Sequence, residues 1–236
     1  RDLHSFPTRR SSDLKGTSKS HSAAENSKFV SSFLRGVLDP EEYRRLIAQF
    51  YFVYSTMEKC IKESDDRWVE KNYYPELERV ESLSKDLEYY YGPNWKELIS
   101  KTPACITYCF RIEEVAKQDP YLLIAHHYTR YIGDLSGGQI LKKIAQNALK
   151  PPVGKGLDFY DFPEIEDSKE WKNVYRFHLD NMGFTESQKN AIISEANYAF
   201  RMNMYLFEEI GVTDPYPFLT FIRALFKVLF GFIGGN

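Results

Sequence analysis

Hydrophobic residues recur along most of this chain at the spacing of an amphipathic helix. In the segment that follows Asp39, apolar side chains fall three or four positions apart, at Leu46, Ile47, Phe50, Tyr54, Met57 and Ile61. Asp39 and Pro40 are residue types preferred at the N-cap and the first position of a helix. We therefore predict a long helix that begins at Pro40.

Further helices are predicted by the same spacing and by their start and stop signals. They cover residues 15–24, 76–91, a segment from Thr102-Pro103, a glycine-bearing segment from Asp119-Pro120, 168–182 and 185–210. A capping-box pattern at Thr185 and Gln188 marks the start of the last one. Residues 151–156 are expected to form a loop. No alternating pattern of useful length indicates a strand, so we predict a single all-α domain over residues 15–211.

Three glycines and a carboxylate interrupt one of these predicted helices. Gly133, Gly137 and Gly138 lie within six residues, although each glycine inside a helix costs about 1 kcal/mol relative to alanine. Gly133 and Gly137 share one face, where another helix or a flat ligand could approach the backbone directly. Spacing alone favours close helix packing, with Asp134 paired to Arg130 one turn back. The ligand-binding face remains the alternative.

Histidines are the next candidates for chemistry. His21 and Glu25 are four residues apart, so on a helix the carboxylate could orient the imidazole as a metal ligand. A solvated surface pair is the simpler interpretation. His126 and His127 point about 100° apart on a helix and cannot share one ligand role. Each of them is expected to be a packed side chain.

Charge and cysteine content narrow the functional classes. The formal net charge of −2 gives no reason to expect a nucleic-acid partner. Lys172 and Arg176 place two cations on one helix face, which suits either an anion or a solvated surface. The three cysteines are few and odd in number, so reduced, buried thiols are expected rather than a metal site.

Both ends of the chain are interpreted separately from the domain. Residues 1–14 are polar and contain no apolar signal-peptide core, and residues 6–14 resemble a translated sequencing adapter, so we expect residues 1–14 to be non-native. Residues 212–236 are predicted to form an amphipathic tail, in which Phe218 to Phe230 has an apolar and a basic side. This segment could pack on the domain or contact a membrane surface peripherally. No stretch reaches the roughly 18 apolar residues of a membrane-spanning helix.

The glycine-bearing segment also carries a family resemblance. Residues 121–143, with the sequence YLLIAHHYTRYIGDLSGGQILKK, resemble the distal-helix signature of the heme oxygenase family. Gly16-Thr17, His21 and residues 24–26 resemble that family's proximal segment, and residues 51–54, 90–92, 159–163 and 200–203 follow in the family's order. The resemblance spans about residues 15–210 and is nearest to the cyanobacterial and plastid type. It implies a compact all-α domain that holds heme b between a proximal and a distal helix.

The resemblance implies a role for each group singled out above. His21 would ligate the heme iron, with Glu25 as its hydrogen-bond partner. The resemblance implies that the backbone at Gly133 and Gly137 lies close to bound oxygen. It also implies that Asp134 holds a network of water molecules that delivers protons, joined by Arg130 and Tyr54. The heme propionates and pocket walls would be contacted by Tyr128, Lys172, Arg176, Phe200, Asn203 and Phe207. Two positions depart from the family: Leu14 replaces a basic residue, and His127 replaces a small one.

The implied function is oxidative cleavage of heme to biliverdin, with release of carbon monoxide and ferrous iron, using O₂ and electrons from a reductant. Ferredoxin is the expected electron donor, docking on the basic residues Lys142, Lys143, Lys172 and Arg176. A monomer in the cytoplasm or plastid stroma is expected. The alternatives are a non-catalytic heme-binding protein of the same fold and a purely structural helical bundle.

Overall fold

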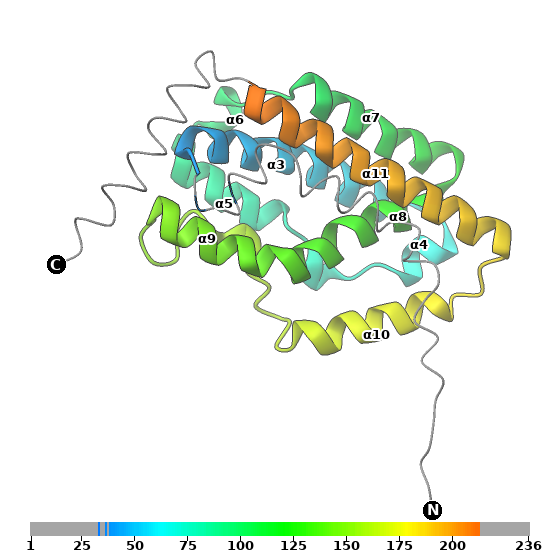
Figure 1. Cartoon of the computed structure of the whole chain (residues 1–236). Helices are drawn as coiled ribbons and strands as arrows, with labels where there is room; N and C mark the ends of the chain where they lie inside the picture. The colour runs from blue at the N-terminus through cyan, green and yellow to red at the C-terminus, as the bar shows by residue number, and fades with distance from the viewer. Residues whose placement is uncertain (1–32, 34–35, 37, 213–236) are drawn as a thin grey trace, which may run out of the picture.

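The computed structural model describes residues 33, 36 and 38–212. Within this part of the chain all regular structure is helical and no strand is present, which confirms the predicted all-α class. The helix predicted over residues 15–24 and the tail over 212–236 lie essentially outside the described residues. Three helices form the body of the molecule and pack against one another: α3 (Pro40–Lys62), α7 (Pro103–Gln118) and α11 (Glu186–Val212) (Figure 1).

The starts of these three helices follow the sequence signals. Asp39 Oδ1 accepts a hydrogen bond of 2.8 Å from the Glu41 amide, and Pro40 is the first residue of α3. Thr102 caps α7 in the same way. In front of α11, Thr185 Oγ1 accepts from the Gln188 amide at 3.2 Å, while Gln188 Oε1 accepts from the Thr185 amide at 3.0 Å. These reciprocal bonds confirm the predicted capping box.

The helix predicted over residues 76–91 is wrong at its N-terminal end. Pro75–Leu77 forms a separate 3₁₀ turn, η2, and the helix α5 begins only at Val80 and ends at Tyr91. The cause is Arg79, which is buried and donates its guanidinium hydrogen bonds to loop carbonyls, including Leu77 O at 2.8 Å. Glu58 also accepts from the Arg79 backbone amide at 2.7 Å. A continuous helix could not satisfy these groups in the same way.

Several short helical pieces were absent from the prediction because three to five residues contain too little periodicity to detect. They are α4 (Arg67–Lys71), α6 (Trp95–Leu98) and η6 (Asp158–Tyr160), whereas the 3₁₀ turn η3 (Pro120–Leu122) opens the helix that was predicted from Asp119-Pro120. The loop predicted over residues 151–156 is confirmed, and it follows Lys150, which is left-handed with φ of 49°. No helix of the described part is long and apolar enough to cross a membrane.

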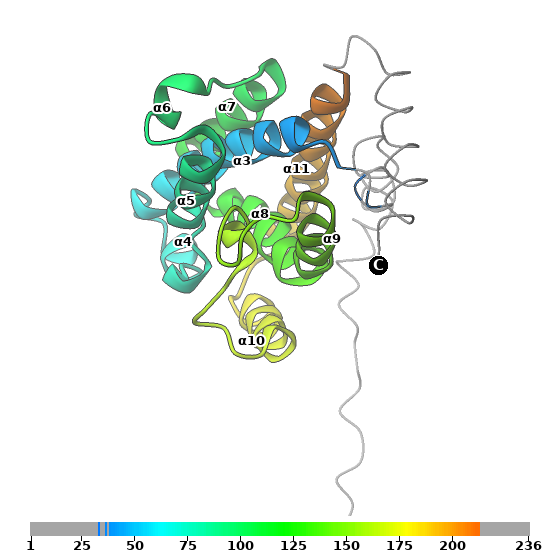
Figure 2. The same cartoon turned by 90° about the vertical axis from the view of Figure 1, so that its left-hand side faces the viewer.

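Helix α10 (Ser168–Asp180) stands apart from the rest of the bundle in both views (Figures 1 and 2). It ends two residues earlier than predicted, and Gly183 follows with a positive φ of 78°. Its inner face carries the buried Tyr175, which bonds to Asn72 and His127. This arrangement places α10 beside the glycine-bearing segment.

Cys105 and Cys109 are buried, as predicted, whereas Cys60 is half-buried. Cys105 and Cys109 are one turn apart on α7, with their Sγ atoms 3.9 Å apart and not bonded as a disulfide. Among the described residues no group of three or more His, Cys, Asp or Glu side chains could hold a metal ion.

Candidate functional site

The predicted glycine-bearing helix is present, but its middle is wider than an α-helix. Helix α8 (Leu123–His127) passes into two π-helical turns, η4 (Tyr128–Ile132) and η5 (Asp134–Gly138), before α9 (Gln139–Leu149) resumes. Gly133, between the two turns, keeps helical angles of φ −61° and ψ −48°. π-Helical turns are rare and occur frequently at functional sites. The sequence pattern predicted a helix here but not its wider form.

One side of this segment is bare and the other is packed. A Cβ atom added to Gly133 or Gly137 would meet no atom of the described residues within 4 Å. A Cβ on Gly138 would instead contact Tyr160 Cδ1 at 3.5 Å and Asp134 Cβ at 3.7 Å. Within the described part of the chain, therefore, Gly133 and Gly137 do not serve close helix packing. They leave an exposed stretch of backbone that a flat group could approach.

Asp134 lies beside that bare backbone and is held by residues from two helices. The Tyr54 hydroxyl of α3 donates a hydrogen bond to the Asp134 carboxylate. Arg130 Nε donates to the same Tyr54 oxygen at 2.9 Å, and Arg130 Nη2 lies 3.7 Å from Asp134 Oδ1. All three side chains are buried. The predicted Arg130–Asp134 pair is present, although Tyr54 makes the more direct contact.

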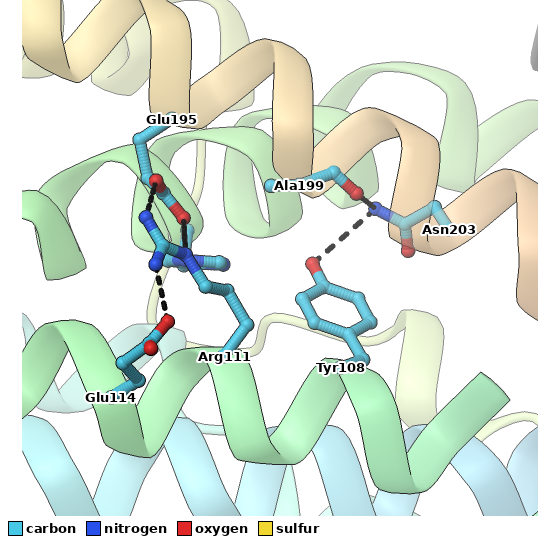
Figure 3. A network of polar contacts seen from close by, with 7 residues as sticks. Tyr108, Arg111, Glu114, Glu195, Ala199 and Asn203 are labelled. Atoms are coloured by element: carbon cyan, nitrogen blue, oxygen red, sulfur yellow. Dashed lines mark hydrogen bonds and ion pairs between the residues drawn. The ribbon is translucent and has the colours of Figure 1, made fainter. Parts of the chain in front are cut away.

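Helix α11 completes this network through Asn203. Arg130 Nη1 donates to Asn203 Oδ1. Asn203 Nδ2 donates to Ala199 O at 3.0 Å and to Tyr108 Oη at 3.4 Å, as Figure 3 shows. The guanidinium is therefore fixed from both sides, which in turn fixes the Tyr54 hydroxyl. The sequence did not indicate a role for Tyr108. A tyrosine at a buried position of α7 fits the helical spacing equally well with or without a hydrogen bond from its hydroxyl.

Burial sets the proton affinity of this cluster. Desolvation raises the pKa of Asp134 above the ordinary value for aspartate, although Arg130 and the Tyr54 hydrogen bond oppose the shift. Burial also raises the pKa of Tyr54 well above its ordinary value. The site thus places a carboxyl group with increased proton affinity at the edge of an exposed backbone. Such a group can hold or deliver a proton next to a bound ligand.

Two cations of α10, Lys172 and Arg176, lie beside the phenol of Tyr128 on η4. Lys172 Nζ donates to Leu135 O at 3.2 Å and to Ser136 Oγ at 3.0 Å, which ties α10 to the η5 turn. Burial and the nearby Arg176 lower the pKa of Lys172. Burial raises the pKa of Tyr128, opposed by a hydrogen bond from Arg176. The structure therefore brings Tyr128, Lys172 and Arg176 together, in a group suited to anionic substituents of a ligand.

Both histidines of the segment are packed side chains, as predicted. His126 Nε2 lies 2.9 Å from Glu195 Oε1, and Arg111 also binds Glu195, at 2.6 Å (Figure 3). Burial would raise the pKa of Glu195, but these two partners outweigh it and lower the pKa to about 2. His127 Nδ1 is 2.8 Å from the Tyr175 hydroxyl, and burial lowers the pKa of His127 to about 3.

Of the remaining candidates, the structure describes Phe200 and Phe207 but not His21 and Glu25. Phe200 is buried on α11, and Phe207 lies with its ring 6.3 Å from that of Phe50, one turn before Tyr54. His21 and Glu25 lie outside the described residues.

A buried polar cluster behind the site was not predicted. Glu58 accepts hydrogen bonds from the Tyr131 hydroxyl at 3.1 Å and from the Arg79 amide. Burial raises the pKa of Glu58 to about 7. On α3, Glu58 stands among polar residues such as Lys59 and Lys62. No sequence signal distinguishes a buried glutamate from the exposed charges beside it.

Comparison with known proteins gives one consistent result. The family model described as "Heme oxygenase" matches residues 11–209. A protein named heme oxygenase from Rhodella violacea is 48% identical over 92% of this chain and 90% of its own length. The crystal structure of heme oxygenase-1 from Synechocystis sp. PCC 6803 in complex with heme superposes with a TM-score of 0.82 at 43% identity, covering 94% of this chain and 97% of that one. Heme oxygenase-2 from the same organism, in complex with heme and NO, gives 0.84 at 38% identity, covering 92% and 89%.

Proposed function

Since this chain belongs to the heme oxygenase family, we propose that it cleaves the heme ring beside Asp134 and produces biliverdin, carbon monoxide and ferrous iron. Heme degradation itself is the activity of this enzyme family. The observation that carries the finer proposal is the position of a buried, tethered carboxyl at the edge of the bare Gly133–Gly137 backbone.

The residues present fit a heme. The face of Gly133 and Gly137, where no described atom would meet an added Cβ, offers a flat surface for a planar ring. Lys172, Arg176 and Tyr128 offer cations and a hydroxyl for carboxylate substituents. The Synechocystis relatives of the same fold were crystallised in complex with heme. Together these features favour a ring lying on η5 with its propionates toward α10.

The chain's own groups would orient the ring and handle protons. Bound heme supplies the iron that activates O₂ and the ring that is cleaved. Asp134, held by Tyr54 and Arg130, would keep a proton source at the bare backbone. Lys172 and Arg176 would fix the rotation of the ring and so decide which of its edges faces Asp134. His21, with Glu25 as its hydrogen-bond partner, is the residue that would hold the iron.

Ferredoxin is proposed as the electron donor because basic side chains surround the expected heme edge. Lys143, which is exposed, is the residue of that set to which we assign the largest part in docking, because Arg176 is hydrogen-bonded to Tyr128. Lys142 already forms an ion pair with Asp161, and Lys172 is bonded to the η5 turn. An acidic partner would approach faster at low ionic strength, since exposed charges are screened by salt.

The test combines heme titration with turnover. Purified protein is mixed with heme, O₂ and either ascorbate or a ferredoxin system, and absorption spectra follow the loss of heme and the appearance of biliverdin. Turnover is expected with both reductants, and His21→Ala should abolish it while the matched variant His178→Ala does not.

Each outcome has one meaning. Stable heme binding without turnover by either reductant would favour the non-catalytic heme-binding protein. Turnover with ascorbate alone would leave the oxygenase standing and contradict ferredoxin as donor.

A further inference from the structure

A continuous row of aromatic rings runs from Tyr54 at the site to Trp171 on α10. Ring centroids are 5.6 Å apart from Tyr54 to Tyr131, 4.6 Å from Tyr131 to His127, and 5.6 Å from His127 to Tyr175. Tyr175 and Trp171 are stacked at 5.3 Å with an interplanar angle of 18°. Tyr54 belongs to α3, His127 and Tyr131 belong to α8 and η4, and Tyr175 and Trp171 belong to α10. The proposed heme chemistry assigns no role to its last four members.

The first two tyrosines of the row each donate their hydroxyl hydrogen to a carboxylate. Tyr54 donates to Asp134, and Tyr131 donates to Glu58 Oε1 at 3.1 Å. A phenol that loses an electron becomes strongly acidic, so its oxidation is much easier when a hydrogen-bonded base can accept the proton. Each of these phenols therefore has the local partner that one-electron oxidation requires.

The third tyrosine has an equivalent partner in His127. Tyr175 Oη accepts a hydrogen bond from Asn72 Nδ2 at 3.1 Å, which directs the phenol hydrogen toward His127 Nδ1 at 2.8 Å. The imidazole is buried and neutral, so that nitrogen is able to accept a proton. Its ring also lies nearly parallel to that of Tyr175, at 13°, and fills the space between Tyr131 and Tyr175.

The outer end of the row reaches the surface. Trp171 is half-buried on α10, where its Nε1 donates to Glu76 Oε1 at 3.3 Å. Tyr74 flanks the end of the row, with its ring 5.2 Å from Trp171. A charge that arrived at Trp171 could thus be exchanged with a small reductant in solution, whereas Tyr54 and Tyr131 are fully enclosed.

We propose that this row is an electron relay that carries oxidising equivalents from the heme site to Trp171 when hydrogen peroxide reacts with bound heme outside the productive cycle. The inference rests on the proposed function, because the oxidant arises on bound heme. Its benefit would be protective: damage is moved away from the buried site, to a residue that ascorbate can reduce again.

The relay balances in electrons and protons. Tyr54 gives up one electron toward the heme site while its proton moves to Asp134; an electron from Tyr131 restores Tyr54, and the proton returns. Tyr131 with Glu58 and Tyr175 with His127 repeat this step, and Trp171 supplies the last electron. Ascorbate then gives one electron to the oxidised Trp171 side chain and restores it. Two such transfers, with two protons from solution, convert one hydrogen peroxide into two waters.

The experiment uses the full chain loaded with heme and treated with one equivalent of hydrogen peroxide, without reductant. Freeze-quenched electron paramagnetic resonance records protein radicals, and peptide mass spectrometry locates oxidised side chains. Trp171 is expected to be oxidised ahead of Trp68, which is also half-buried, and ahead of Trp95. Ascorbate present during the reaction should suppress oxidation of Trp171.

Variants test the path itself. Tyr131→Phe or Tyr175→Phe keeps the ring but removes the oxidisable phenol, so oxidation of Trp171 should fall to the level of Trp68. The matched control Tyr51→Phe alters a ring that packs on Trp95 outside the row and should leave Trp171 oxidation unchanged. Circular dichroism confirms folding of each variant.

Heme binding separates the two possible failures. Failure of the wild-type protein to bind heme would overturn the proposed function and the relay with it. Normal heme absorption, with equal oxidation of the three tryptophans or no effect of Tyr131→Phe and Tyr175→Phe, would overturn the relay alone.

Discussion

Replacing Gly133 with alanine should stabilise the heme-free protein and weaken heme binding at the same time. Gly133 has helical backbone angles, so alanine fits its conformation without strain. No atom of the described residues lies within 4 Å of the added methyl group. Without ligand the change removes the entropic disadvantage of glycine in a helix. With ligand the methyl group occupies the space that we assign to the ring.

The expected effects on the stability of the heme-free protein and on heme affinity have opposite signs. Alanine is favoured over glycine by about 0.5–1 kcal/mol inside a helix, which for a chain of this size corresponds to a rise in Tm of about 2–4 °C at the upper value. Inserting a methyl group into a filled contact disfavours it by about 1–3 kcal/mol. At about 1.4 kcal/mol per tenfold change, the heme Kd should rise roughly 5- to 150-fold.

Gly138→Ala is the matched control, because its methyl group would point to the packed side, at 3.5 Å from Tyr160. Thermal unfolding of the heme-free proteins and heme titration followed by absorption measure the two effects. Gly138→Ala should bind heme as the wild type does. A Gly133→Ala protein that is destabilised without heme, or that binds heme with wild-type affinity, would refute the assignment of the bare face.

Three other changes probe the buried polar groups. Glu58→Gln should abolish a pH dependence: burial raises the pKa of Glu58 to about 7, so the free energy of unfolding of the wild type should fall by about 3 kcal/mol as pH rises from 4.5 to 7. His127→Gln should act on the acid side, since the lowered pKa of His127 makes the wild type lose about 1.4 kcal/mol for each pH unit below 6.5, down to about 3. Asn203→Ala should destabilise the protein by about 1–3 kcal/mol, because Arg130 loses a buried acceptor, and should slow heme turnover.

Urea unfolding at several pH values measures the first two effects. Parallel stability profiles for wild type and Glu58→Gln, or for wild type and His127→Gln, would contradict the assigned titrations. For Asn203→Ala, a normal turnover rate in a destabilised protein would mean that the α11 contact supports the fold but not Asp134.

Helix starts could be predicted from the sequence because they depend on local chemistry. Asp39 with Pro40, Thr102 with Pro103, and the capping box at Thr185 act over three or four residues, and each is found where expected. The start of α5 could not be predicted, because it depends on where Arg79 finds carbonyl partners 80 or more residues away. Local patterns do not contain such distant partners.

The candidate site was likewise predictable only where its contacts join residues close in sequence. Periodicity alone identified Gly133 and Gly137 as sharing a face and Arg130 as a partner for Asp134. The Tyr54–Asp134 bond joins residues 80 positions apart, and only the family resemblance indicated it. The two π-helical turns, Tyr128–Ile132 and Asp134–Gly138, were not predicted, because the glycines marked an interruption of the helix but not the form that it takes.

A crystal structure of the heme complex tests the central claim most directly. We expect the porphyrin to lie flat against the backbone of Gly133 and Gly137, with its propionates at Lys172 and Arg176 and the His21 imidazole on the iron from the opposite side. Heme bound at another surface, or a second helix packed against the two glycines in its place, would contradict it.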